Sequence, residues 1–148
     1  MTKKEVLYAI SEQLAEKKLR LLQDATDLSE AIAQDDKSSA GDKYETSREM
    51  SQQELDKIHA AIAENKRFET LVNQFIALPT SIRIQAGSLV TTSEFILLFG
   101  LPLGTLKINE LTIIGIGASA PLAQQLLGRT SNETITFQGK QLTIISVE

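Results

Sequence analysis

The stretch QDDKSSAGDKYET, residues 34–46, separates two long segments that have the composition of helices. It carries four carboxylates, on Asp35, Asp36, Asp42 and Glu45, against only two lysines. Its glycine and serines are typical of a turn between helices. We therefore expect the chain to reverse direction at this stretch, which we call the acidic tip, and to concentrate negative charge there.

The segments on either side of the acidic tip predict two paired helices. Neither proline nor glycine occurs in residues 3–36 or 42–78. Apolar residues recur every three or four positions, with one interruption at Lys17 and Lys18, and make narrow stripes typical of a coiled coil. Two such stripes joined by a short turn pair most simply as an antiparallel hairpin. The stripe residues are Leu7, Ile10, Leu14, Leu21, Ala25, Leu28 and Ile32 in the first segment, and Leu55, Ile58, Ile62, Val72 and Ile76 in the second.

The rest of the chain has a different composition. Residues 1–78 hold 11 Lys or Arg and 15 Asp or Glu, whereas the remainder holds 4 and 4. Runs of β-branched and aromatic residues between turn residues predict about five strands, ending in a hairpin that turns at Gly139-Lys140. Pro121 and Gly128 are placed to open and close a short helix. The predicted fold is α+β: an antiparallel coiled-coil hairpin, residues 1–78, followed by a small β-rich domain, residues 79–148.

Composition excludes several classes of protein. The chain has no cysteine, so it has no disulfide, thiolate metal site or cysteine nucleophile. A net charge of −4 does not fit a basic nucleic-acid-binding protein. The longest nearly apolar run, residues 95–104, is about half of the roughly 20 residues that a membrane helix needs. With no signal peptide expected either, we expect a cytoplasmic protein.

Capping alone offers an explanation for two of the tip carboxylates. Asp-x-x-Glu at a helix start is a capping-box pattern, in which Asp42 accepts from a helical N–H and Glu45 bonds back. Carboxylates also suit the positive end of a helix dipole. Asp35 and Asp36 lie near the negative end of the preceding helix, where the dipole disfavours them. Capping therefore leaves these two residues unexplained.

Two motifs, in this order of parts, resemble the Gre family of bacterial transcript cleavage factors. GDKYE at 41–45 is similar to the family's Gly-Asp-x-x-Glu at the hairpin turn, which matches Asp42 and Glu45 to its acidic pair. APLAQQLLGR at 120–129 is similar to a Ser-Pro-(Ile/Leu)-Gly-x-x-Leu-(Leu/Met)-Gly-(Lys/Arg) stretch of the family's FKBP-like C-terminal domain. The resemblance covers essentially the whole chain and implies an FKBP-like fold for its second part.

The resemblance also implies a mechanism. The β-rich domain would dock on bacterial RNA polymerase while the helical hairpin enters the secondary channel. Asp42 and Glu45 would hold a Mg²⁺ shared with the polymerase active site, and Asp35 and Asp36 would add negative field. The polymerase would hydrolyse the 3′ end of backtracked RNA, so this chain would be an accessory factor rather than an enzyme, with no cofactor of its own. The residues implied to contact polymerase are Pro121, Leu122, Leu126, Leu127 and Gly128.

Two alternatives stay open. The protein could bind the secondary channel and inhibit or modulate polymerase without cleavage, or it could be a coiled-coil interaction module unrelated to transcription. Co-purification with core polymerase and a cleavage assay on a backtracked complex separate these alternatives. We expect a monomer without a membrane partner, whereas the module predicts a stable dimer. Basic residues along the hairpin are compatible with an RNA path and equally with an ordinary solvated coiled coil; they are Lys17, Lys18, Arg20, Arg48, Lys57, Lys66 and Arg67.

Overall fold

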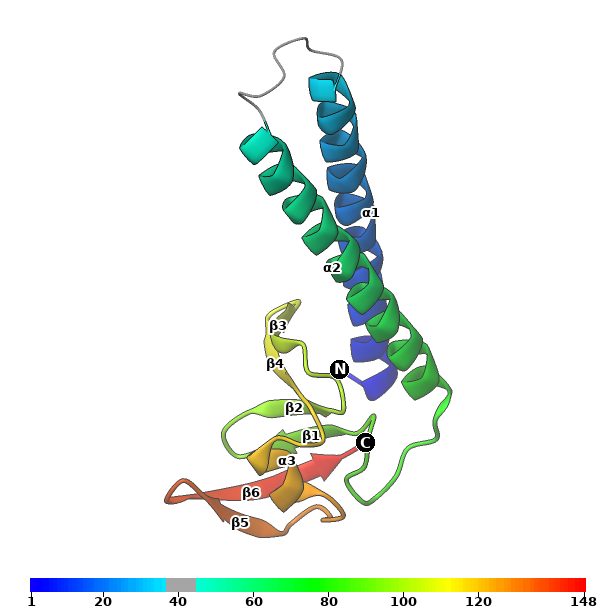
Figure 1. Cartoon of the computed structure of the whole chain (residues 1–148). Coiled ribbons are helices and arrows are strands. Elements are labelled where there is room, and N and C mark those ends of the chain that lie inside the picture. The colour runs from blue at the N-terminus through cyan, green and yellow to red at the C-terminus, as the bar shows by residue number, and fades with distance from the viewer. Residues whose placement is uncertain (37–44) are drawn as a thin grey trace. The chain divides into compact units, whose positions relative to one another are not determined.

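The computed structural model describes the backbone of residues 1–36 and 45–148, and the side chains of residues 1–34 and 47–148. Two long helices, α1 (Lys3–Asp36) and α2 (Glu45–Ala77), precede a sheet and one short helix (Figure 1). The strands are β1 (Leu89–Thr92), β2 (Ile96–Phe99), β3 (Gly104–Ile108), β4 (Leu111–Ile116), β5 (Thr134–Phe137) and β6 (Lys140–Val147), and α3 (Pro121–Leu126) comes between β4 and β5. The protein is therefore α+β, with a helical hairpin followed by a small β-rich part, as the sequence predicts.

The long helices form where no residue breaks the backbone ladder. At the start of α1, the Thr2 N–H donates to the Glu5 carboxylate at 2.9 Å, and the Glu5 N–H donates to the Thr2 hydroxyl at 3.2 Å. This reciprocal pair is a capping box, which satisfies two of the N–H groups that the first helical turn leaves free. No helix in the described part of the chain has an apolar stretch sufficient to cross a lipid bilayer.

The described chain divides into two compact units. The arm is the unit within Glu12–Thr70, and the body consists of Met1–Ser11 and Leu71–Glu148. The body includes the ends of both long helices because, for example, Phe75 is buried against the turns at Gly87 and Gly100. The predicted division at residues 78 and 79 concerns the order of helices and strands along the chain, and it stays a prediction.

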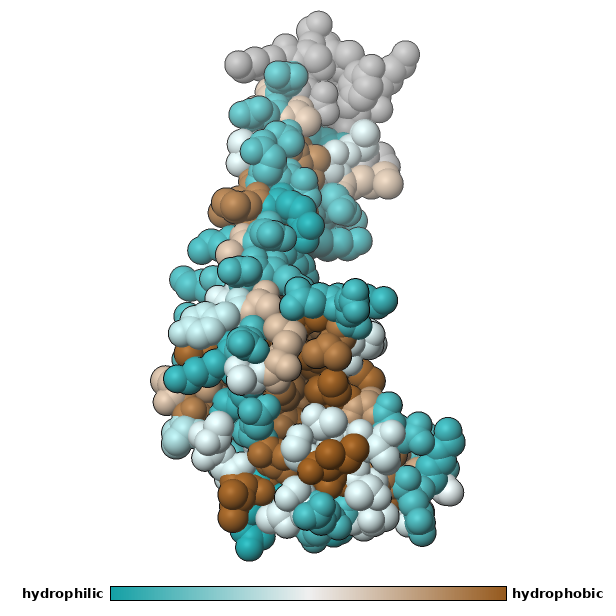
Figure 2. Space-filling view, turned by 180° about the vertical axis from the view of Figure 1, so that it is seen from behind, coloured by the Kyte–Doolittle hydropathy of each residue, from teal (hydrophilic) through white to brown (hydrophobic). Residues whose placement is uncertain are grey.

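The arm is a pair of antiparallel helices. Asn65 of α2 donates to the main-chain oxygen of Leu14 on α1 at 3.0 Å, whereas Ala25 and His59 line one groove farther along. A higher residue number on α1 thus faces a lower one on α2. Leu14, Ala25 and Leu55 are buried in the predicted seam, and the visible arm surface is mainly hydrophilic (Figure 2). The predicted coiled-coil pairing is therefore confirmed for the described arm.

The body is built on a six-stranded mixed sheet, one strand more than the sequence predicts. The strand order is β3-β4-β2-β1-β6-β5, in which β2 and β4 are parallel and all other neighbours are antiparallel. The predicted turn at Gly139-Lys140 is wrong by one residue. Phe137 pairs with Lys140, so the turn residues are Gln138 and Gly139, with φ values of 51° and 78°. A two-residue hairpin turn of this hand needs positive φ at both positions.

The hydrophobic core of the body lies between one face of the sheet and α3. Side chains alternate along each strand, so Leu97 and Phe99 of β2 join this core whereas Leu98 faces the opposite side. The buried members of the core are Ile84, Val90, Leu97, Phe99, Ala123, Leu126, Ile135, Leu142 and Ile144. Because α3 has only six residues, several apolar side chains at the margin of this core are only partly buried.

Candidate functional site

The acidic tip contributes no described side chain to a site. Asp36 is the last residue of α1 and Glu45 is the first residue of α2. The side chains of Asp35, Asp36 and Glu45, and the whole of Asp42, lie outside the described residues. Their predicted roles in holding Mg²⁺, and the capping interpretation of Asp42 and Glu45, therefore stay predictions.

The predicted polymerase-binding residues lie on α3 and the turn that follows it. Pro121 occupies the first turn of α3. The N–H groups of a first turn make no hydrogen bond within the helix, so proline, which lacks an N–H, is tolerated there. Leu126 is fully buried in the core, whereas Leu127 is 57% exposed. Leu126 therefore holds α3 on the sheet, and Leu127 faces solvent. Of the two leucines, only Leu127 offers surface to a partner.

Gly128 ends α3 in a conformation that favours glycine. Its φ is 80°, in the left-handed region, and its N–H donates to the Ile84 oxygen at 2.9 Å. The Ile84 N–H in turn donates to the Arg129 oxygen at 2.9 Å, and the Arg83 guanidinium donates to the Gly128 oxygen at 3.1 Å. The Leu-Leu-Gly-Arg sequence thus attaches the end of α3 to the segment that precedes β1.

The loop after α3 is held by a carboxylate. The Thr130 N–H donates to Glu133 at 2.5 Å, and this bond is the main cause that holds the pKa of Glu133 below its ordinary value. The Thr130 hydroxyl and the positive charges of Arg129 and Arg83 act in the same direction. Glu133 is therefore a structural anion of this loop.

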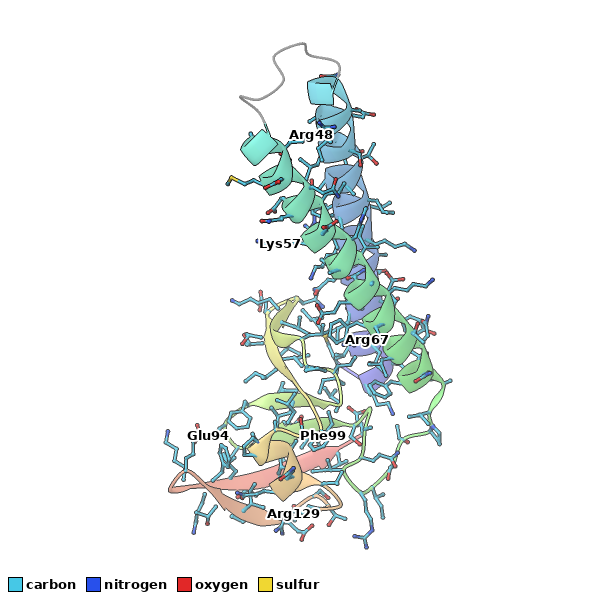
Figure 3. All side chains as sticks on the ribbon, viewed as in Figure 1. Arg48, Lys57, Arg67, Glu94, Phe99 and Arg129 are labelled. Carbon is cyan, nitrogen blue, oxygen red and sulfur yellow. The ribbon has the colours of Figure 1, made fainter. Side chains whose placement is uncertain are left out.

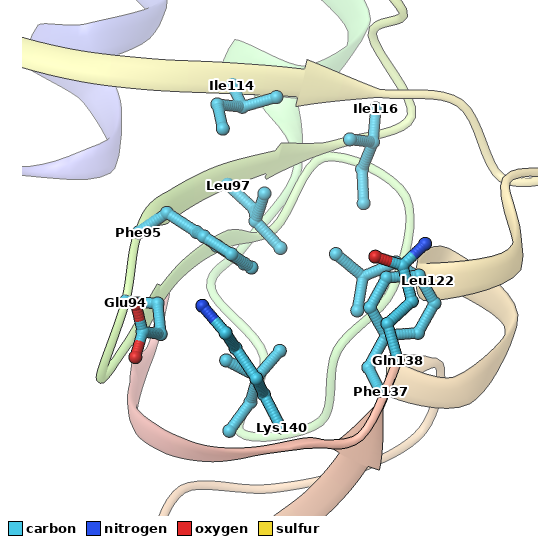
Figure 4. A pocket seen from close by; sticks show the side chains of 10 residues that line it. Glu94, Phe95, Leu97, Ile114, Ile116, Leu122, Phe137, Gln138 and Lys140 are labelled. Atoms are coloured by element: carbon cyan, nitrogen blue, oxygen red, sulfur yellow. The ribbon is translucent and has the colours of Figure 1, made fainter.

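An open apolar pocket of about 310 Å³ lies beside α3 on the core face of the sheet (Figure 4). Leu122, the second residue of α3, is one of its walls and is only partly buried. The pocket thus begins where the short helix stops covering the sheet. Its lining residues are Glu94, Phe95, Leu97, Ile114, Ile116, Leu122, Phe137, Gln138, Lys140 and Leu142.

The β1–β2 turn fixes one side of the pocket. The buried Thr92 hydroxyl accepts from the N–H of Phe95 at 3.0 Å and of Glu94 at 3.3 Å, and donates to the Phe95 oxygen at 2.8 Å. The Ser93 N–H also donates to the Thr143 oxygen of β6 at 2.9 Å. These bonds place the Phe95 ring and the Glu94 carboxylate at the pocket.

The other side of the pocket comes from the β5–β6 hairpin and α3. Phe137 ends β5, Gln138 forms the turn, and Lys140 begins β6. Figure 4 shows Phe137, Gln138 and Leu122 grouped opposite Phe95, with the Lys140 amino group directed toward the side where Glu94 lies. Two opposite charges thus flank an apolar floor.

This arrangement suits the binding of a partner. Partly buried aromatic and aliphatic side chains gain free energy when a partner covers them, and flanking charges orient the partner. Among residues 1–34 and 47–148, no cluster of His, Cys, Asp or Glu is placed to hold a metal ion.

On the arm, three of the basic residues named from the sequence, Arg48, Lys57 and Arg67, follow one another along α2 (Figure 3). The Arg67 guanidinium carbon lies 6.0 Å from the ring centroid of Phe68.

Sequence reasoning found Leu122 but missed the other pocket residues. Strand alternation indicates that Phe95, Ile114 and Phe137 belong to strands or their ends, but it does not indicate which of them stay partly uncovered. The local signal was the placement of two phenylalanines, Phe95 directly before β2 and Phe137 at the end of β5.

Comparison with known proteins finds a distant structural likeness. No model of a known protein family matches this sequence, and no curated protein matches it. Among solved structures, the chain is similar to the transcription factor Gfh1, at 15% identity and a TM-score of 0.35, over 93% of this chain and 92% of that chain. A TM-score this low does not establish a shared fold, so the function of this protein is argued from its own residues.

Proposed function

We propose that this protein is an accessory factor of bacterial RNA polymerase that stimulates the polymerase's own cleavage of backtracked RNA. The arm enters the secondary channel, the body binds the polymerase surface, and Asp42 and Glu45 reach the active site. The proposal is supported by the two sequence motifs and by their places along the chain. Residues 41–45 lie between α1 and α2 in the sequence, and residues 120–129 include α3 of the body.

The antiparallel arm is the observation that carries the proposal. Its helical segments, residues 12–36 and 45–70, are about 37 Å long at 1.5 Å per residue. The acidic tip connects the end of the first segment to the start of the second. The proposal therefore assigns the tip carboxylates to the end of the hairpin opposite to residues 12 and 70. A narrow pair of helices with mainly hydrophilic surface suits insertion into a water-filled channel.

The chemistry of phosphodiester hydrolysis explains the need for acid at the tip. A two-metal route requires a second Mg²⁺ and an oriented water for in-line attack. Mg²⁺ prefers oxygen ligands and keeps several waters, so one or two added carboxylates retain it without a closed protein cage. Asp42 and Glu45 supply these oxygens only in the complex, and Asp35 and Asp36 add negative charge nearby. Hydrolysis itself belongs to the polymerase.

The body supplies the docking surface. The apolar pocket beside the start of α3 is open and is flanked by Glu94 and Lys140, and Leu127 adds an exposed apolar side chain directly after the other end of that helix. Covering such side chains with a polymerase segment removes apolar area from water and stabilises the complex. Of the residues first implied to contact polymerase, only Leu126 is buried; Pro121, Leu127 and Gly128 are exposed and Leu122 is partly buried, so these four are accessible to a partner.

The decisive variant is Asp42→Asn. Asparagine caps a helix about as well as aspartate, so a capping role survives the change, but a metal-holding charge does not. Loss of even an outer partner of a metal ligand typically costs about 10-fold to 100-fold. We therefore expect cleavage of RNA in a stalled, backtracked complex to fall at least about 10-fold, while binding to core polymerase is retained.

Asp24→Asn is the matched control, because Asp24 is an exposed carboxylate of α1 well before the tip, and it should cleave like the parent. Equal cleavage by Asp42→Asn and the parent would refute the metal-holding role. A parent protein that binds polymerase and blocks cleavage would favour the inhibitory alternative. A parent protein that does not bind polymerase would favour an interaction module unrelated to transcription.

A further inference from the structure

Among the described residues of the arm, one buried polar side chain has incomplete hydrogen bonding. Asn65 of α2 is 3% exposed. Its Nδ2 donates to the main-chain oxygen of Leu14 on α1 at 3.0 Å and to Oε1 of Glu69 at 2.9 Å. Both partners are acceptors, so the amide nitrogen must face them. Asn65 Oδ1 is left without a hydrogen-bond partner among the described residues.

Stability does not explain asparagine at this position. A buried acceptor without a partner costs about 1–3 kcal/mol, and a well-packed leucine is often as stable or more stable in a helical seam. A polar residue in a coiled-coil seam is best known for specifying which register the helices adopt, at a cost in stability. The bond from Asn65 has that specificity, because it joins a side chain to a single main-chain atom of the partner helix.

The hydrogen bond from Asn65 to Leu14 lies next to a part of the seam where apolar packing constrains the register of the two helices least. After Leu14, every residue of α1 from 15 to 20 is exposed, including Lys17 and Lys18 at the interruption of the stripe. The stripe resumes with Leu21, which is only half-buried. No α1 side chain from 15 to 20 is buried, so apolar packing resists sliding of the helices less here than at the buried Leu14 and Ala25 on either side.

We propose that Asn65 is a positioning residue that fixes the register of α1 against α2 in the arm. The consequence for activity rests on the proposed function: one register gives the tip carboxylates one reach into the polymerase. The register itself is a property of the free protein and is measured without polymerase.

Spin labels report the register directly. The chain has no cysteine, so Ala31→Cys on α1 and Ala63→Cys on α2, both at exposed positions, give one pair of labels in the full-length protein. Pulsed electron–electron double resonance should find one narrow distribution of distances between the labels at positions 31 and 63 when Asn65 is present. With Asn65→Leu added, we expect a broadened or second distance, displaced by up to one helical turn, about 5.4 Å.

Two measurements separate positioning from simple stabilisation. The midpoint of urea unfolding should be unchanged or higher in Asn65→Leu, because an apolar side chain replaces an unsatisfied polar one. Leu55→Met, a volume-conserving change at another buried seam position, should leave the distance unchanged. A lower midpoint with one unchanged distance in Asn65→Leu would overturn the proposal. If that variant fails to fold, Asn65→Ala removes the same bond, and its distance decides in the same way.

The effect of Asn65 on activity is measured with a stalled, backtracked polymerase complex. If the parent cleaves, Asn65→Leu should bind polymerase like the parent and cleave at least about 10-fold less, because a small misplacement of reacting groups can cost 100-fold. A changed register with unchanged cleavage would overturn the positioning role and leave the proposed function standing. A parent that does not cleave would overturn the proposed function and leave the register result standing.

Discussion

At the scale of single residues, Gly115 shows how closely the backbone packs inside the body. It lies in β4 opposite Leu98 of β2 and Gly104 of β3. A Cβ at Gly115 would meet the Leu101 oxygen at 2.2 Å, closer than any real contact allows. The atom in the way belongs to the backbone of the β2–β3 connection, and Leu101 is fully buried there, so the connection has little room to move.

We expect Gly115→Ala to lower the free energy of unfolding by about 3 kcal/mol, the cost of forcing extra volume into a packed interior. Gly117→Ala is the matched control, since its Cβ would meet Pro102 at an ordinary 3.5 Å, and we expect a change within about 1 kcal/mol. Equilibrium urea unfolding of the two variants measures the difference. Equal midpoints for both would show that the Leu101 connection yields at little cost.

At the scale of elements, the shortness of α3 creates the pocket. Six residues bury Ala123 and Leu126 on the sheet, and the sheet face beyond Leu122 is left open. The β1–β2 turn and the β5–β6 hairpin border this opening with Phe95 and Phe137. A longer helix would cover these side chains and remove the proposed docking surface.

We expect Leu122→Ser to weaken binding to core polymerase at least about 10-fold, which corresponds to about 1.4 kcal/mol, because it removes an apolar wall of the pocket. Ile145→Ser is the control: Ile145 is 56% exposed on β6 and does not line the pocket. Titration of labelled polymerase with each folded variant gives the affinities. Equal weakening by both changes would place the docking surface elsewhere on the body.

At the scale of the whole molecule, the seam of the arm is occupied by the chain's own two helices. Leu14, Ala25 and Leu55 are buried within one chain. The large apolar side chains exposed on the described arm are few: Leu19 and Leu22 are neighbours on α1, and Met50 lies on α2. A few exposed apolar residues are normal on monomeric proteins.

We therefore expect a monomer at micromolar concentration, near the chain mass of 16.2 kDa. Sedimentation equilibrium measures this mass directly. A stable dimer would mean that another surface of the chain pairs, and it would favour the interaction-module interpretation over an arm that enters a narrow channel alone.

Local sequence predicted most of the elements, although the sheet has six strands where about five were expected. The proline-free segments whose apolar residues recur every three or four positions form α1 and α2. Pro121 begins α3, and Gly128 follows its end, as expected. Turn residues separated the strands correctly except at the β5–β6 hairpin, where the turn falls at Gln138-Gly139. These features depend on neighbours a few positions away, and the sequence contains all the information they need.

Only the tertiary structure decided the pocket and the burial of Asn65 against Leu14. The pocket residues run from Glu94 to Leu142 in the chain, and they meet because β2 pairs in parallel with β4 while α3 covers only part of the sheet face. Asn65 resembles any polar residue of a helix until Leu14, 51 positions away, lies against it. Which side chains stay uncovered, and which polar group loses water, depends on packing between distant segments, and no local pattern of residues encodes it.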